Sequence, residues 1–203
     1  LWSADDSDDD DDTRRFLGEM NRVVDIGHTN DALALNDLME LETPLRYTYD
    51  DTVFIQKITP TENITIKNGT IIDIDSNSKF IGGTGGGPEA QMLENITIKD
   101  IKTEGFEKGL MLFDETVNLK IINCDFKVTN KNTNAARQGI NLRRCCEKVL
   151  ISGCTIRGFR TPVYTRMGHL DYGPCKDIIV TDNNFYSIKE DTRYEDDGQY
   201  EVN

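Results

Sequence analysis

The chain has no run of about 18 apolar residues, the length at which a segment becomes a candidate membrane-spanning helix. It has no basic stripe of the kind that binds nucleic acid and no Cys-x-x-Cys pair of the kind that holds zinc. Its glycine-rich segment, residues 82–88, lacks the Lys-Ser/Thr pair of a phosphate-binding loop. We therefore expect no membrane insertion, no nucleic-acid partner, no metal site and no cofactor.

Basic residues are also scarce at the two ends of the chain, where acidic residues are concentrated. Residues 1–12 carry a net charge of −7 and residues 190–203 carry −5, which leaves about −1 of the total of −13 for the body. Blocks of like charge repel one another and are normally solvated. We expect residues 1–24 to form an acidic, largely flexible segment and residues 190–203 to form a second acidic segment.

What the body contains is a repeat. Five segments can be aligned, and their first residues are separated by 32, 23, 30 and 29 positions: 63–71, 95–103, 118–126, 148–156 and 177–185. Each alternates apolar and polar residues, turns at a small or amide-bearing residue and resumes with another apolar position. A repeat of 20 to 35 residues built from strand, turn and strand is typical of a β-solenoid. We expect a parallel β-helix over residues 53–189, with about five rungs.

The alternation within the repeats assigns faces, because successive strand residues point to opposite sides. The residues expected to point inward and stack are Ile64 and Ile66, Ile96 and Ile98, Leu119 and Ile121, Val149 and Ile151, and Ile178 and Val180. The residues expected at the turn, in left-handed backbone conformation, are Asn68, Asp100, Asn123, Gly153 and Asp182. The Asn-x-Thr triplets at Asn63, Asn68 and Asn95 fall in these columns, so we interpret them as turn chemistry rather than glycan acceptors.

A second strand column precedes three of the repeats. When segments 109–113, 139–143 and 162–166 are aligned, the alternation predicts two outward rows. One row would contain Met111, Asn141 and Tyr164, and its neighbour would contain Phe113, Arg143 and Arg166.

Residues 25–52 precede the repeats, and we expect them to form a capping helix and the segment that leads into the first strand. Segment 29–41 has apolar residues at helical spacing and an early Asp31, and Pro44 follows it. These features predict a short capping helix, followed by a first strand over residues 53–58.

The five cysteines are odd in number and irregular in spacing. Cys124 and Cys154 share one column of the aligned repeats, so we expect them to be inward, adjacent and reduced, packing as small apolar side chains. A disulfide between them stays open as an alternative, since stacked strands supply the required Cβ geometry only in some cases.

Two motifs carry a resemblance to a known superfamily. Gly139-Ile-Asn-Leu142, followed by Lys148-Val-Leu-Ile-Ser-Gly-Cys-Thr-Ile156, resembles the right-handed, single-stranded parallel β-helix of pectin-lyase-like proteins. Gly27-His-Thr-Asn-Asp-Ala-Leu-Ala-Leu35 is similar to the capping segment of phage tailspikes. The resemblance implies an all-β right-handed solenoid, a homotrimer and a place on a virion surface or outside the cell. It also implies a polysaccharide ligand on the outer face of one sheet.

The sugar-cleaving chemistry of one branch of that superfamily is not supported. Polygalacturonases carry Asn-Thr-Asp, an Asp pair and Gly-His-Gly, whereas this chain has Asn132-Thr-Asn134 at the first position and Phe159-Arg160 near the second. Only Gly168-His169 of the third motif is kept. Whether the protein is an enzyme is therefore left open.

The candidate site lies on and beside the outward rows. Arginines pair with carboxylates and aromatic rings stack on sugars, so the predicted ligand-binding residues, with an acidic polysaccharide as ligand, are Asn141, Arg143, Tyr164 and Arg166. If the protein is a polysaccharide lyase or glycoside hydrolase, which needs paired acids and bases, the predicted catalytic residues are Asp114, Glu115, His169 and Asp171.

Three functions remain at this point. The first is a tailspike or tail-fibre segment that binds a host surface polysaccharide, either with or without cleaving it. The second is a free extracellular lyase or hydrolase, and the third is a non-catalytic structural or adhesive β-helix.

Overall fold

The computed structural model describes residues 2–5, 15–18, 23–27, 38–41, 53–54, 59–73, 80–81, 90–106, 110–128, 138–166, 175–188 and 200–202. The chain divides into two compact units, one comprising Leu1–Lys57 with His169–Gly173 and the other comprising Ile58–Gly168 with Pro174–Asn203. No helix in the described ranges has the length and apolar character needed to cross a membrane.

The first unit contains two small antiparallel sheets. Strands β1 (Trp2–Asp5), β2 (Arg15–Gly18) and β5 (Val53–Phe54) form one sheet in the order β2-β1-β5. Strands β3 (Val23–Gly27) and β4 (Leu38–Leu41) form the other.

The capping helix predicted for residues 29–41 is not confirmed. Its last four residues are strand β4, paired with β3, so the helix prediction is wrong there, and residues 29–37 lie outside the described residues. A four-residue run such as Leu-Met-Glu-Leu is compatible with both the helical and the strand pattern of apolar residues. Pairing with a neighbouring strand therefore decides its conformation. Val53–Phe54 pair with β1, and the solenoid sheet begins at β6.

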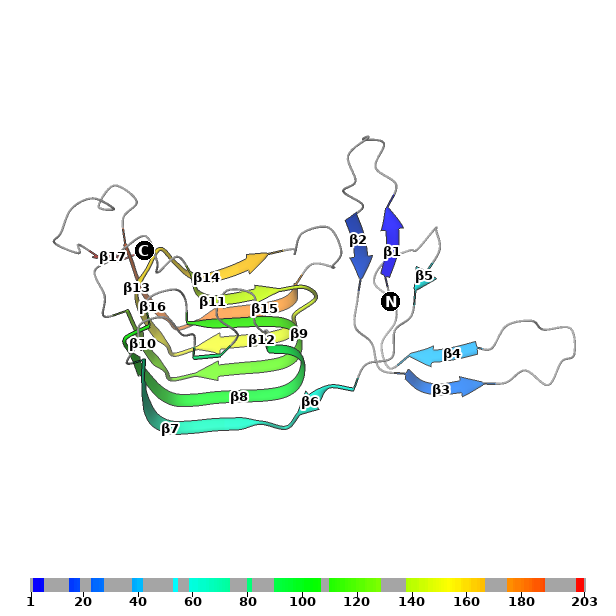
Figure 1. The fold of residues 1–203 in the computed structure, drawn as a ribbon, viewed down its shortest axis with the longest axis horizontal. Helices are drawn as coiled ribbons and strands as arrows, with labels where there is room; N and C mark the ends of the chain where they lie inside the picture. The colour runs from blue at the N-terminus through cyan, green and yellow to red at the C-terminus, as the bar shows by residue number, and fades with distance from the viewer. Residues whose placement is uncertain are drawn as a thin grey trace, which may run out of the picture. The chain divides into compact units, whose positions relative to one another are not determined.

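The second unit is a parallel β-solenoid, as the repeats predicted (Figure 1). Its strands are β6 (Thr61–Glu62), β7 (Thr65–Ile72), β8 (Ala90–Glu104), β9 (Met111–Ile122), β10 (Asp125–Lys127), β11 (Gln138–Arg143), β12 (Glu147–Ser152), β13 (Thr155–Phe159), β14 (Thr161–Arg166), β15 (Lys176–Thr181), β16 (Asn184–Ile188) and β17 (Tyr200–Val202). All of their pairings are parallel except that of β17 with β16.

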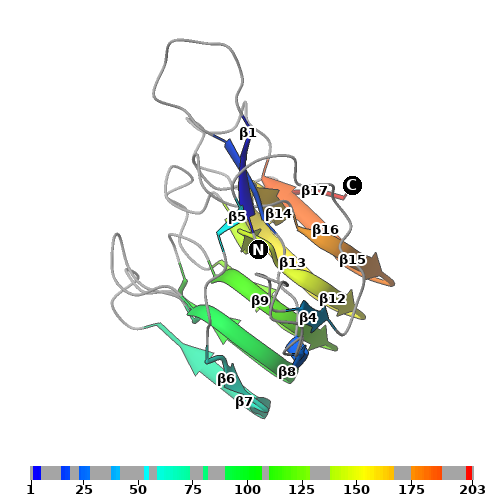
Figure 2. The ribbon, with the colours of Figure 1, turned by 90° about the vertical axis from the view of Figure 1, so that its right-hand side faces the viewer.

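The predicted inward column is confirmed. Ile66 pairs with Ile98, Ile98 with Ile121, Ile121 with Ile151, and Ile151 with Val180. The strands that carry them, β7, β8, β9, β12 and β15, lie side by side (Figure 2). The three middle isoleucines are fully buried, whereas Val180 on the last strand is 42% exposed. The column is therefore fully buried at its centre and more exposed at its final rung.

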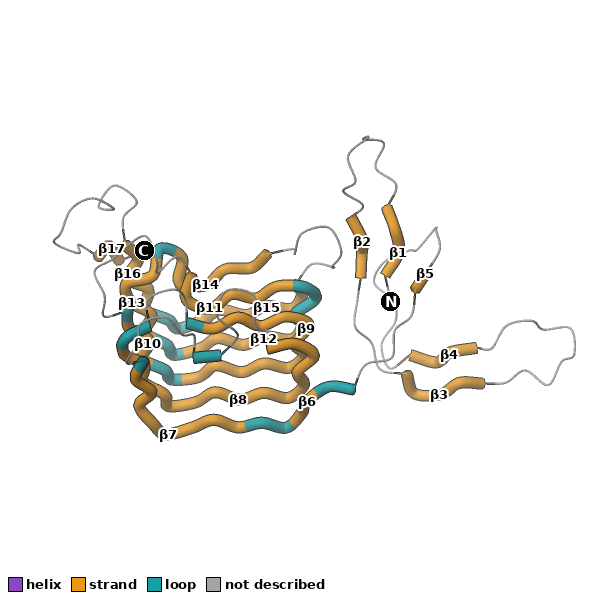
Figure 3. The backbone as a smooth tube through the Cα atoms, viewed as in Figure 1, coloured by secondary structure: helices purple, strands orange, loops and turns teal. Residues whose placement is uncertain are grey.

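Short loops join several successive strands of the solenoid (Figure 3). The bends use left-handed backbone, as predicted. Positive φ angles occur at every member of the predicted turn column, namely Asn68, Asp100, Asn123, Gly153 and Asp182. A second column of positive φ contains Asn63, Asn95, Asn118, Lys148 and Asp177. Short polar side chains tolerate this conformation better than bulky ones because they hydrogen-bond locally.

Asparagine side chains of the second of these columns hydrogen-bond to one another from rung to rung. The amide of Asn95 donates to Oδ1 of Asn63 at 3.3 Å, and the amide of Asn118 donates to Oδ1 of Asn95 at 2.6 Å. The side chains of Asn63 and Asn95 are therefore engaged between rungs, which supports the interpretation of these triplets as turn chemistry.

Two cysteine pairs occupy neighbouring rungs inside the coil. Cys124 and Cys154 are 2% and 0% exposed, both are free thiols and the two are in hydrogen-bonding contact, as predicted. Cys146 and Cys175 form an equivalent contact that the repeat alignment did not pick out.

Candidate functional site

The outward rows of the second strand column differ from those predicted by one residue on β9. Asn141 and Arg143 on β11 pair with Tyr164 and Arg166 on β14, as expected. On β9, however, their partners are Leu112 and Asp114, while Met111 and Phe113 pair with the inward Ile140 and Leu142. Met111 and Phe113 are 1% and 0% exposed, so their predicted outward placement is wrong.

The one-residue difference between the predicted and the observed register of β9 has a local cause. The pairing of β9 with β11 joins residues 29 positions apart, whereas the pairing of β9 with β12 joins residues 30 positions apart. The additional residue is accommodated at the corner between β11 and β12, where Arg144 and Cys145 both have positive φ. A shift of one residue exchanges the two faces of a strand. The apolar run 110–113 has no alternation that could have revealed it.

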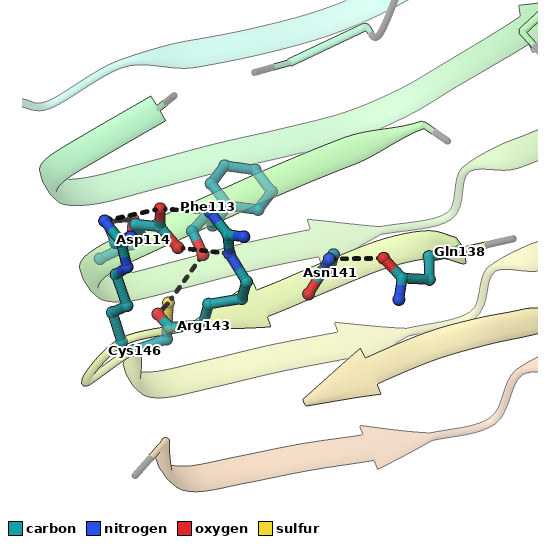
Figure 4. A network of polar contacts seen from close by, with 8 residues as sticks. Phe113, Asp114, Gln138, Asn141, Arg143 and Cys146 are labelled. Atoms are coloured by element: carbon teal, nitrogen blue, oxygen red, sulfur yellow. Dashed lines mark hydrogen bonds and ion pairs between the residues drawn. The ribbon is translucent and has the colours of Figure 1, made fainter. Parts of the chain in front are cut away.

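The correct register places Asp114 beside Arg143. Arg143 Nε donates to Asp114 Oδ1 at 3.0 Å, and its Nη2 donates to Oδ2 at 2.9 Å, so the pair is bidentate (Figure 4). Arg144 Nη1 lies 3.6 Å from the same Oδ2. Asp114 is completely buried, while the Arg143 side chain is 19% exposed. A buried carboxylate needs such partners because its desolvation would otherwise cost several kcal/mol.

The corner backbone supports this cluster. Met92, Glu115 and Arg144 all have positive φ, and Glu115 N–H donates to the Arg144 carbonyl at 2.8 Å. Cys146 Sγ lies 3.4 Å from the carbonyl oxygen of Phe113 and 3.1 Å from that of Arg143. The two arginines that hold Asp114 are thus fixed by the bend itself, and we call Asp114, Glu115, Arg143 and Arg144 the corner cluster.

Glu115 is the second carboxylate of the corner cluster and is partly exposed. Burial raises its pKa above the ordinary value of 4.5, Arg144 opposes that rise and the neighbouring Asp114 adds to it. A carboxyl whose pKa is raised holds its proton more firmly in the folded state. Its ionisation therefore lowers stability as the pH rises from below the unfolded pKa to above the folded one.

This shift makes a prediction for Glu115→Gln. The free energy of unfolding of the variant relative to the parent is expected to increase as pH rises from about 3 to 7, because only the parent must ionise a partly buried group. Urea unfolding at several pH values measures the difference. A difference that stays constant or decreases over this range would show that the attraction to Arg144 outweighs burial.

The structure describes some of the remaining predicted site residues and not others. Asn141 is 8% exposed, and its amide donates to Gln138 Oε1 at 2.6 Å, while its own buried Oδ1 has no hydrogen-bond partner among the described residues (Figure 4). Tyr164 is partly exposed beside it. The backbone of Arg166 is in register with Arg143. His169 and Asp171 lie outside the described residues.

The sequence reasoning missed Arg144 and Gln138. Arg144 directly follows segment 139–143, outside the residues whose alternation assigned the rows. Gln138 precedes the Gly139 with which the alignment began. Among the described residues, no group of three or more His, Cys, Asp or Glu side chains is placed to hold a metal ion.

Comparisons with protein-family models, with curated proteins and with solved structures found no match to this chain.

Proposed function

We propose that the solenoid binds an acidic polysaccharide along β11 and β14, through the partly exposed side chains of Arg143 and Tyr164. The observation that carries the proposal is the local charge. The corner cluster together with Arg166 contains three arginines and two carboxylates, in a body whose net charge is about −1 and a chain whose net charge is −13. A positive excess on an acidic protein favours a ligand with repeated carboxylates.

The geometry of the face supports binding by stacking and pairing. Tyr164 sits beside Asn141, and Arg166 sits beside Arg143, one strand apart in each case. Neighbouring strands lie about 4.8 Å apart, so groups on β11 and β14 can contact one polymer together. Asp114 acts here as a positioning residue that fixes the Arg143 guanidinium.

Cleavage at Asp114 is not part of this proposal. The carboxylate is fully buried and engaged by Arg143 and Arg144, which leaves it out of reach of a water molecule or a sugar ring. Glu115 is the partly exposed carboxylate of the cluster, with a pKa shifted in the direction that suits a general acid. A host-surface ligand, a homotrimer and a virion or extracellular location remain predictions of the tailspike resemblance.

A structural, non-catalytic solenoid is the second candidate. It is favoured by the burial of Leu112, Asp114 and Asn141, which are 3%, 0% and 8% exposed although their rows point away from the core. These side chains are closed to a ligand as they stand.

Binding to polygalacturonate, a soluble polyuronate, tests the proposal, with neutral dextran as the control polymer. Tyr164→Ala and Arg166→Gln are expected to raise the Kd for polygalacturonate at least about tenfold, which corresponds to ~1.4 kcal/mol each. The loss at Arg166 should shrink in high salt, since salt weakens the attraction between a protein cation and an anionic polymer. Isothermal titration calorimetry measures the affinities.

Lys120→Gln is the matched control, because Lys120 is an exposed cation on β9 that pairs with Thr97 and Leu150 rather than with β11. It should leave the affinity unchanged. If the parent does not bind the polyuronate, or if all three variants bind as tightly as the parent, the structural candidate replaces the binding one.

A further inference from the structure

The coil contains two thiol pairs that are nearly identical in geometry. Lys176 N–H donates to the Cys146 carbonyl at 2.8 Å, and Thr155 N–H donates to the Cys124 carbonyl at 2.8 Å. These bonds place Cys175 opposite Cys146 and Cys154 opposite Cys124 on adjacent parallel strands. Adjacent strands lie about 4.8 Å apart, within the range of roughly 4.4–6.8 Å that disulfides span between Cα atoms.

The two pairs differ in access to solvent. Cys124, Cys154 and Cys146 are 2%, 0% and 0% exposed. Cys175, which directly precedes β15, is the partly exposed member. Thiol–disulfide exchange requires that an attacking sulfur reach its partner, so only the Cys146–Cys175 pair offers an entry point.

We infer that Cys146 and Cys175 form an oxidisable site, at which a small disulfide such as oxidised glutathione converts the two thiols into a bond between rungs. The Cys175 thiolate attacks one sulfur of glutathione disulfide and releases one glutathione thiolate. Cys146 then loses its proton to solvent, and its thiolate attacks Sγ of Cys175 and releases the second glutathione. Two thiols are oxidised, and one glutathione disulfide is reduced to two glutathione molecules.

The contact between the two sulfurs favours Cys175 as the thiol that reacts first. The hydrogen bond from Cys146 lowers the pKa of the Cys175 thiol, an effect that burial partly opposes. The same contact and deep burial raise the pKa of Cys146. The more accessible sulfur is therefore also the more readily ionised one, as a first nucleophile requires.

The bond would attach the residue before β15 to Cys146, two residues after Arg144 of the corner cluster. Cys146 directly follows the Arg143–Cys145 bend, and β15 pairs with β12 alone among the described strands. A covalent link directly before its first residue, Lys176, should suppress opening of this strand, which is held along one edge by hydrogen bonds to β12.

Treatment of the full chain with oxidised glutathione, followed by peptide mapping without reduction, tests the inference. A Cys146–Cys175 linked peptide is expected, while Cys124 and Cys154 stay reduced. Amide exchange of β15 is expected to slow by about tenfold or more in the oxidised protein. Cys146→Ala should trap Cys175 as a stable mixed disulfide with glutathione, and Cys154→Ala should leave the yield of the linked peptide unchanged.

Three results would each overturn the inference. They are a Cys175 that stays unmodified in the parent, a parent Cys175 that stops at the mixed disulfide, and a Cys124–Cys154 link that forms first. An unchanged exchange rate in β15 would overturn the stabilising role. The mapping of the parent protein decides the matter even if a variant does not fold.

Discussion

Replacing Arg143 by Met is expected to lower the free energy of unfolding by about 3–5 kcal/mol, the range seen when one member of a buried ion pair is removed. Asp114 is 0% exposed and would lose both hydrogen bonds of its bidentate partner. Arg144, at 3.6 Å, would remain as a weaker partner. Urea unfolding monitored by circular dichroism measures the loss.

Arg157→Met provides the matched control. Arg157 also pairs with a carboxylate on the neighbouring strand, with Nη2 2.6 Å from Asp125 Oδ1, but the two side chains are 42% and 39% exposed. Exposed pairs contribute about 0–1 kcal/mol, so the loss should be correspondingly small. Equal losses at the two sites would mean that the burial of Asp114 does not set the strength of its ion pair.

The pairing of Arg143 with Asp114 also bears on the binding proposal. Removing the charge of Arg143 would change binding and stability together, so a loss of affinity in that variant would have two explanations. The double variant Arg143→Met with Asp114→Leu separates them. It replaces the pair with apolar groups of similar size and should recover most of the lost stability, while the charge that attracts an anionic ligand stays absent.

Much of the solenoid could be predicted because each rung repeats the same local signals. Alternation identified the column from Ile66 to Val180, and small or amide-bearing residues identified the turn column from Asn68 to Asp182. These signals are local, and stacking reinforces them from rung to rung. Pairings over long sequence separations therefore followed from short patterns.

The site was predictable only in part. The rows on β11 and β14 were placed correctly because Gly139-Ile-Asn-Leu and Pro162-Val-Tyr-Thr alternate clearly. The row on β9 was misplaced because Leu110, Met111, Leu112 and Phe113 are all apolar and all buried. An alignment cannot detect one extra residue at a corner when the adjoining strand shows no alternation of apolar and polar residues. Burial of Asp114 depends on the packed structure, which no local pattern reports.

The second large effect concerns the inward column. Ile121→Ala is expected to lower the free energy of unfolding by about 2–5 kcal/mol, which is typical of large-to-small changes in a packed core. Ile121 is 0% exposed and lies between Ile98 and Ile151 on the two adjacent strands. The shortened side chain would leave a gap that both neighbouring rungs line. Equilibrium unfolding in urea gives the value.

The same substitution at Ile66 should cost roughly half as much or less. Ile66 is partly exposed, and β7 pairs with β8 alone among the described strands, so its side chain has one stacked neighbour instead of two. In a solenoid, stability is approximately a sum over rungs and over the interfaces between them. A residue in the middle contributes to two interfaces, and a residue at an end contributes to one. If Ile66→Ala destabilised the protein as much as Ile121→Ala, the column would have to unfold as one cooperative block in which position along the stack does not matter.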